Sequence, residues 1–154
     1  MSRVLVLAGL AIAGAAGCTV DTETGVGADV LATDVTFAGT GLEATIALQM
    51  TVRFHVGEHV MEARTFIPLR VDLFVGEDIV GTVNLDRPAG FDNTLEPGET
   101  ESVDFTGSGF VANATARDLA CDPAALVTIL IRWDDMTADE IRMDSITTND
   151  VTCM

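Results

Sequence analysis

The chain has 154 residues, among them 24 Asp or Glu, 8 Arg and no Tyr, and its formal net charge is −16. Such an acidic surface repels nucleic acid and anionic lipid, which excludes both as binding partners, and it favours solubility and cation binding. The length suffices for one domain with its own hydrophobic core, and no internal repeat divides it.

The first 17 residues have the layout of a secretory signal peptide. Arg3 precedes an apolar run from Val4 to Ala16, and small residues end this run. The run is too short to cross a bilayer, which takes about 20 apolar residues. We therefore predict that residues 1–17 are a signal peptide.

The residues Ala15-Ala16-Gly17-Cys18 resemble the lipobox of bacterial and archaeal lipoproteins, although that family usually has Leu where this chain has Ala15. The resemblance implies that the Cys18 thiol takes a diacylglycerol, so that Cys18 begins a mature protein anchored by lipid in the cell envelope. Residues 18–29 would link the lipid to the domain. Two alternatives stay open: cleavage near Ala16 that releases a soluble secreted protein, and a retained membrane anchor.

Three cysteines, Cys18, Cys121 and Cys153, leave one thiol without a partner in an exported protein. If Cys18 is acylated, Cys121 and Cys153 form a pair that an oxidising compartment would join in a disulfide. The midpoint of this pair, residue 137, falls in a predicted turn, which places the two cysteines across the open end of a hairpin. Two free buried thiols and a two-cysteine metal site are the alternatives.

Apolar residues recur with a period of two along most of the chain, which is typical of strands with one buried face. The clearest segment runs from Leu42 to Val56. The predicted strands are 31–37, 42–56, 67–75, 79–85, 99–110, 125–133 and 141–147, and one short helical turn falls within 113–120. On the third strand Ile67 and Leu69 would face the core, and Trp133 would lie within it.

About seven short strands separated by turns predict an all-β fold, an antiparallel β-sandwich over residues 30–154. The segments Val71-Asp72-Leu73-Phe74-Val75-Gly76-Glu77, Val80-Gly81 and Leu95-Glu96-Pro97-Gly98-Glu99-Thr100 resemble the immunoglobulin-like modules of bacterial and archaeal surface proteins. The resemblance implies an immunoglobulin-like sandwich related to adhesion modules. The matching residues are turn residues, so the resemblance implies no active-site chemistry.

Three loops would meet at one end of such a sandwich: 57–65, 86–98 and 134–140. They are rich in the oxygen ligands that calcium prefers, and the candidate ligands are Asp86, Asp92, Asn93, Asp134, Asp135 and Asp139. No segment has the spacing of an EF-hand calcium loop, so a solvated acidic rim is the competing interpretation. The first strand, and with it the lipid anchor, would start at this same end.

His55 and His59 form an H-x-x-x-H pair, a spacing that binds zinc on a helix, with Glu58 and Glu62 nearby. Here His55 falls on the exposed face of a predicted strand, and Gly57 turns the chain before His59. We therefore expect exposed histidines near a turn rather than a metal site.

The sequence patterns that would indicate a catalytic site are weaker than those that would indicate a metal site. Ser108 in Gly107-Ser108-Gly109 lacks the G-x-S-x-G spacing and the strand-to-helix turn of a nucleophile elbow. Asp134 and Asp135 are adjacent in a predicted turn, where nothing would bury one carboxyl and raise its pKa. We expect a protein that is not an enzyme and has no cofactor, calcium being the one candidate.

Together these features predict a non-catalytic, immunoglobulin-like lipoprotein of the cell envelope that acts as a binding or structural module. Its partners would be the membrane, through the lipid anchor, and an envelope protein, a glycan or a second copy of itself, but no nucleic acid. One alternative is a filament subunit that assembles by β-strand addition, with 42–56 as the segment concerned. A calcium-binding envelope protein, and an enzyme or metal carrier, are the others.

Overall fold

The computed structural model describes residues 25–154, so the predicted signal peptide and Cys18 lie outside the described residues. The strands are β1 (Val26–Ala38), β2 (Thr45–Val56), β3 (Arg64–Val75), β4 (Asp78–Leu85), β5 (Thr94–Leu95), β6 (Thr100–Val111), β7 (Val127–Asp135), β8 (Glu140–Thr148) and β9 (Val151–Cys153). The helical elements of this part are the 3-10 turn η1 (Gly41–Glu43) and the helix α1 (Ala116–Ala120). The all-β prediction is confirmed. From residue 25 onward, no helix combines the length and apolarity that a membrane crossing needs.

All seven predicted strands are present, and the structure adds two short ones, β5 and β9. β1 is longer than predicted because it starts at Val26, inside the segment 18–29 that the sequence assigns to a linker. Val26, Ala28 and Val30 are partly buried and pack against the core. The strand with its core-facing residues therefore extends into this segment, where glycine and alanine make it hard to detect from sequence.

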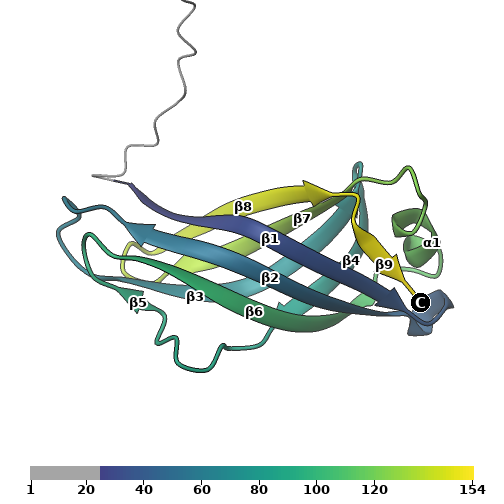
Figure 1. Ribbon diagram of the computed structural model, residues 1–154, viewed down its shortest axis with the longest axis horizontal. Helices are drawn as coiled ribbons and strands as arrows, with labels where there is room; N and C mark the ends of the chain where they lie inside the picture. Colours follow the sequence, from purple (N-terminus) through teal and green to yellow (C-terminus); the bar gives the residue numbers. More distant parts are fainter. Residues whose placement is uncertain (1–24) are drawn as a thin grey trace, which may run out of the picture.

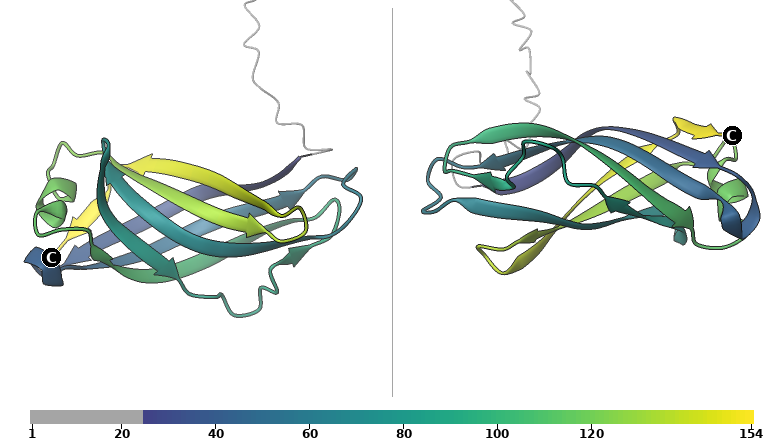
Figure 2. Two further views of the ribbon diagram at one scale, coloured as in Figure 1. Left: turned by 180° about the vertical axis from the view of Figure 1, so that it is seen from behind. Right: turned by 90° about the horizontal axis from the view of Figure 1, so that it is seen from below.

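The strands pair in one mixed sheet with the order β8-β7-β3-β4-β6-β2-β1-β9, and β5 pairs with the start of β3. Neighbours in this order are antiparallel except β1 and β9, which run parallel. The sheet curls until its two halves face each other across the core (Figures 1 and 2). The sequence predicts a sandwich of about seven strands, whereas the structure has one curled sheet of nine.

Two glycines of β6 let it approach β4, the strand that joins it to the other half of the sheet. A Cβ on Gly109 would collide with the carbonyl oxygen of Thr82, and a Cβ on Gly107 would lie 2.7 Å from that of Asn84. The segment Gly107-Ser108-Gly109 therefore lies inside a strand, where its glycines serve close packing.

The core contains alternate residues of β2 and β7, as the period of two predicts. Trp133 is fully buried, with its ring centre 4.9 Å from that of Phe54, which confirms its predicted place in the core. Leu42 is an exception, because it is 70% exposed in η1. Gly39 and Gly41 have positive φ and turn the chain there, so β2 begins three residues later than predicted, at Thr45.

A β-bulge in β3 makes the predicted orientation of its first half wrong. The register between β3 and β7 shifts after Pro68, so Leu69 is an extra residue without a partner on β7. As a result, Phe66 is buried, while Ile67 and Leu69 are 37% and 45% exposed. Beyond the bulge the predicted alternation resumes.

The connections β2–β3, β4–β6 and β7–β8 meet at one end of the sheet, as the sequence predicts. The backbone N–H of Met136 donates to the carbonyl of Thr65, which joins the β7–β8 turn to the start of β3. β1 also starts here, because the N–H of Gly57 donates to the carbonyl of Gly25. The chain therefore enters the described domain at this end, which we call the acidic end.

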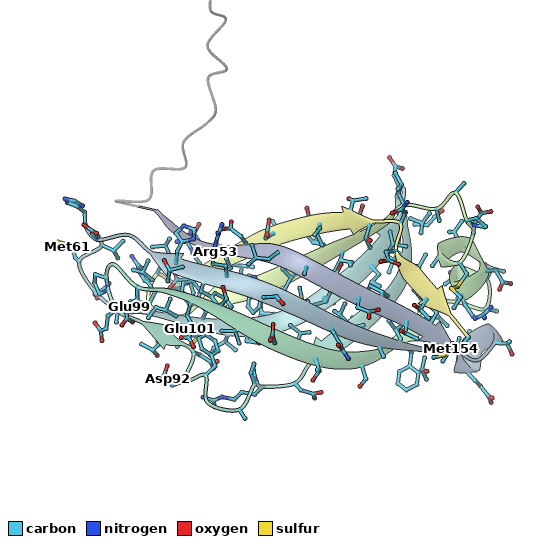
Figure 3. The ribbon with its side chains drawn as sticks, in the orientation of Figure 1. Arg53, Met61, Asp92, Glu99, Glu101 and Met154 are labelled. Carbon is cyan, nitrogen blue, oxygen red and sulfur yellow. A yellow bond between two sulfur atoms is a disulfide. The ribbon has the colours of Figure 1, made fainter. Side chains whose placement is uncertain are left out.

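Figure 3 shows the side chains at the acidic end. Asp92, Glu99 and Glu101 lie there, and Met61 marks the tip of the β2–β3 loop, while Met154 lies at the opposite end of the molecule. The carboxylates are spread over several connections and strands rather than gathered at one point.

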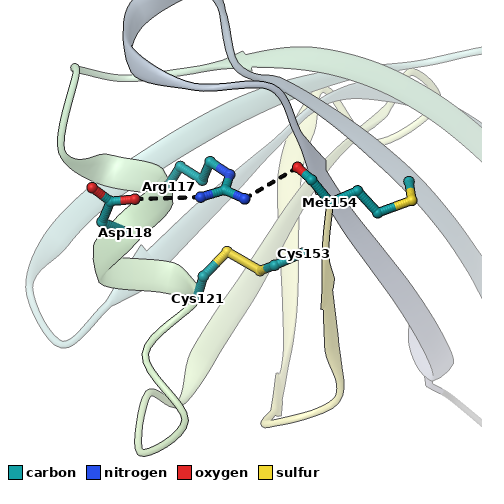
Figure 4. Close-up of a disulfide and its surroundings, with 5 residues drawn as sticks. All are labelled: Arg117, Asp118, Cys121, Cys153 and Met154. Carbon is teal, nitrogen blue, oxygen red and sulfur yellow. Dashed lines mark hydrogen bonds and ion pairs between the residues drawn. A yellow bond between two sulfur atoms is a disulfide. The ribbon is translucent and has the colours of Figure 1, made fainter.

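The end opposite the acidic end is held by a disulfide between Cys121, which follows α1, and Cys153 in β9 (Figure 4). This pairing is the one that the sequence predicts, and the two Cα atoms are 6.1 Å apart. Arg117 of α1 donates to the Met154 carbonyl at 3.1 Å, and the Met154 N–H donates to the Phe37 carbonyl at 2.9 Å. The C-terminal strand is thereby held against both α1 and β1.

We expect the double variant Cys121→Ser with Cys153→Ser to lose about 3–4 kcal/mol of unfolding free energy, because the bridge closes a loop with a sequence separation of 32. Urea unfolding of the variant and of the parent protein measures this difference. Reduction of the parent protein should lower its stability by the same amount. Equal stability of all three samples would show that the bridge does not constrain the fold.

Candidate functional site

β1 and β8 lie side by side at the acidic end without forming a strand pair (Figure 1). We call the gap between Val26–Val30 of β1 and Arg142–Asp144 of β8 the seam. Arg142 Nη1 donates to the Val26 carbonyl at 3.0 Å, and the Val30 N–H donates to Asp144 Oδ2 at 2.7 Å. Side chains of β8 therefore replace the backbone hydrogen bonds that would otherwise close the sheet.

Arg142 and Asp144 occupy inward-facing positions of β8. In the β7–β8 register Arg142 lies opposite Trp133 and Asp144 opposite Ile131, and both partners on β7 are fully buried. Directly opposed residues of an antiparallel pair share one face. The outward-facing Met143 is 63% exposed, so β8 turns its charged residues inward and an apolar residue outward.

Arg142 also closes a buried charge cluster. Asp135 is fully buried, and its Oδ2 accepts a hydrogen bond from Arg142 Nε at 3.1 Å and lies 3.6 Å from Arg64 Nη1. The second terminal nitrogen of Arg142 donates to the exposed Glu140 at 3.1 Å. Because a buried carboxylate is costly without such partners, the cluster fixes where Arg142 lies and thereby where it meets β1.

Ala28 is the residue of the seam whose N–H and C=O both lack a hydrogen-bond partner among residues 25–154. Gly57 donates to Gly25, so odd-numbered residues at this end of β1 face β2 and even-numbered ones face the seam. Val26 and Val30 are bonded by β8 side chains. Ala28 lies between them, and its N–H and C=O point to the seam as a short free strand edge.

A cavity of about 290 Å³ opens at the seam, and Ala28, His55, Trp133 and Arg142 are among the residues that line it. The indole Nε1 of Trp133 is buried and has no hydrogen-bond partner in the described part of the chain. A buried donor left in this state costs about 1–3 kcal/mol. Trp133 therefore packs in the core, lines the cavity, and carries a buried donor that has no partner in the described residues.

His55 packs against the backbone of β1 at the rim of the cavity. A Cβ on Gly27 would lie only 2.5 Å from the His55 Cε1 atom, so the absent side chain makes room for the ring. His55 Nδ1 lies 3.9 Å from Asp29 Oδ2, and the same oxygen accepts from Arg53 Nη2 at 2.9 Å. The rim thus carries both signs of charge in an otherwise acidic protein.

The predicted calcium ligands are not brought together. Asp134 and Asp135 are neighbours in β7 and point to opposite faces, and Asp135 is bound by arginine. The other four are distributed as follows: Asp86 follows β4, Asp92 and Asn93 precede β5, and Asp139 lies in the β7–β8 turn. In the described part of the chain no group of three or more His, Cys, Asp or Glu has a metal-binding arrangement. Neither the calcium ligands nor the pair His55 and His59 gains support from the structure.

The sequence alone does not reveal the seam. It predicts Trp133 in the core but does not connect this residue with Arg142 and Asp144 on the next strand. The available signal was the alternation of the segment 141–147, in which the charged residues Arg142 and Asp144 share one face of the strand with the apolar Ile146. The sequence gives no comparable indication of which side of β1 faces the core, because Gly27 and Ala28 are small.

A second buried charge, Asp72, lies on the outer face of the sheet between β4 and β7. Burial alone would raise the pKa of Asp72. Hydrogen bonds from Arg132 and Thr82, together with the positive charges of Arg70 and Arg132, outweigh that effect and hold the pKa below its ordinary value of 3.8. This cluster ties three strands together and stands apart from the seam.

The substitution Arg142→Gln should destabilise the protein by about 3 kcal/mol, because it leaves Asp135 with Arg64 as its remaining charged partner and frees the Val26 carbonyl. Chemical denaturation measures the loss. Glu140→Gln is the matched control, since it removes only an exposed partner of the same arginine and should change stability by less than about 0.5 kcal/mol. Equal effects of the two substitutions would contradict the role assigned to Arg142.

The unfolding free energy that Asp72 contributes should depend on pH. Because its pKa is lower in the folded state than in the unfolded chain, the contribution is complete above pH 3.8 and is lost as the pH falls through the folded value. The stability gap between the parent protein and Asp72→Asn should therefore shrink in acid. Denaturation at neutral and acidic pH measures it, and a gap that stays constant or widens in acid would argue against a paired carboxylate.

The groups at the seam are suited to binding. They offer hydrogen-bond donors and acceptors and fixed charges, and the described residues that line the cavity include no hydroxyl or thiol nucleophile. We compared the chain with protein-family models, curated proteins and solved structures, and none of them matches it.

Proposed function

We propose that the protein is an exported lipoprotein whose curled β-sheet domain is a non-catalytic binding module of the cell envelope. The observation that carries this proposal is the pairing of Cys121 with Cys153. A disulfide is typical of exported proteins, and this one uses two of the three cysteines. Cys18 is then the cysteine left for lipidation, at the position where the lipobox-like segment requires it.

The geometry of the domain agrees with such a tether. β1 starts at the acidic end, and seven residues separate Cys18 from Val26, so a lipid on Cys18 would hold this end nearest the membrane. Seven extended residues span at most about 25 Å. The disulfide and α1 then lie at the end farther from the membrane (Figure 2).

We further infer that the fold is a variant of the immunoglobulin-like sandwich. The resemblance of the segments around Val71–Glu77 and Leu95–Thr100 supports this inference, as do the two facing halves of the curled sheet. In this interpretation β8-β7-β3-β4 is one layer and β6-β2-β1-β9 is the other. The parallel pair of β1 and β9 is then an addition to that layout.

The substitution Cys18→Ser tests the anchor. In the producing cell the parent protein should fractionate with membranes and carry a diacylglycerol on Cys18, whereas the variant should be released or retain its leader. Fractionation and the mass of the cell-derived protein are the measurements.

Cys121→Ser with Cys153→Ser is the control for this experiment, since it removes the other two cysteines and should leave the membrane association unchanged. A parent protein without lipid, or a Cys18→Ser variant that fractionates like the parent, would overturn the proposed anchor.

A further inference from the structure

At the seam, hydrogen-bonding groups without a partner among residues 25–154 include both backbone groups of Ala28, its N–H and its C=O, on the free edge of β1. The buried Nε1–H of Trp133 also has no partner there. Ala28 and Trp133 line the same cavity of about 290 Å³. A single free donor on a strand edge is common. Here a free strand edge and an unpaired indole N–H belong to residues of one cavity, so one ligand could form hydrogen bonds with both.

A peptide main chain matches these groups. One residue of an extended, antiparallel peptide presents its C=O to the Ala28 N–H and its own N–H to the Ala28 C=O, as a residue of a neighbouring strand would. A second carbonyl of the same peptide can then accept from Trp133 Nε1–H. A lone carboxylate would satisfy the two donors and leave the Ala28 carbonyl without a donor, in a rim that already holds Asp29 and Asp144.

We propose that the seam is a docking site for the main chain of an extended, neutral or basic peptide segment of another protein. The inference deepens the proposed function, because it names the partner of the binding module, and it rests on the binding role rather than on the lipid anchor. The peptide forms a single β-bridge with Ala28 at the mouth of the seam. The volume of the cavity suits a short stretch of chain rather than a complete added strand.

Charge favours a partner protein over a second copy of this chain. The protein has a formal net charge of −16, and the seam opens at its acidic end, so two copies repel each other there. A basic segment is attracted to the same region. A second copy of this chain is therefore the less favoured occupant of the seam, and its binding would appear as self-association that depends on protein concentration.

Trp133 provides the measurement, because it is the single tryptophan of the chain and the chain has no tyrosine. The purified full-length chain would be titrated with a blocked peptide of valine and arginine, and in parallel with its glutamate counterpart, N-acetylglucosamine and acetate. We expect the basic peptide to change Trp133 emission saturably and to shift the single tryptophan indole N–H signal in the NMR spectrum. The other three titrants should have at most weak effects.

Ala28→Pro is the decisive variant, because proline removes the N–H that faces the seam and leaves the hydrogen bonds to β2 untouched. It should weaken peptide binding about fivefold or more, the worth of a main-chain hydrogen bond. Ala28→Ser keeps the N–H and should bind like the parent. Should Ala28→Pro fail to fold, the backbone amide signal of Ala28 in the parent protein serves instead, and it should move together with the indole signal.

The result that would overturn the proposal is an unchanged Trp133 signal with every titrant, or an equal response to acetate or N-acetylglucosamine. Equal binding of peptide by Ala28→Pro and Ala28→Ser would overturn it as well, and so would concentration-dependent self-association that the peptide does not compete with. The Cys18→Ser experiment measures membrane attachment alone. Failure of the proposed lipid anchor is therefore distinguished from failure of the proposed peptide site.

Discussion

Arg142 connects the main parts of this structure through one side chain. Its guanidinium group pairs with the buried Asp135 on β7 and at the same time donates to the Val26 carbonyl on β1. The first contact is strong because the carboxylate has no access to water, and it holds the arginine in place. The second contact brings the start of the chain against β8, where no strand pairing does so. The curl of the sheet is thus closed by side chains at the acidic end.

The opposite end is closed by different means. There β9 pairs with residues 35–37 of β1, and Cys153 joins this strand to the residue that follows α1. β1 pairs with β2 along its whole length, but its other edge is held by the β9 ladder in the second half and by the side chains of Arg142 and Asp144 in the first half. The extra residue in β1 between Val30 and Ala32 lies where attachment by side chains of β8 gives way to pairing with β9. A strand held so differently along its length leaves free backbone groups where the cavity lies.

Much of the fold was predictable because a period of two determines which side chains enter the core, and β2 and β7 follow it throughout. The disulfide was predictable from cysteine number and spacing. Bulges were not, because a single extra residue such as Leu69 reverses the facing of its strand without any change in hydrophobic pattern. The seam was hidden for a related reason: it depends on which strand lies beside β8 and on the absence of a paired strand at the outer edge of Ala28, and both are properties of the sheet order rather than of local sequence.

The structure predicts that β1 and β8 meet through side chains and that the backbone N–H and C=O of Ala28 stay free. Hydrogen exchange of individual backbone amides, followed by NMR in the absence of ligand, tests it most directly. The amide of Val30, which donates to Asp144, should exchange slowly, whereas the amide of Ala28 should exchange rapidly. Slow exchange at both positions would show that β1 and β8 form a regular ladder, and that the seam does not exist in solution.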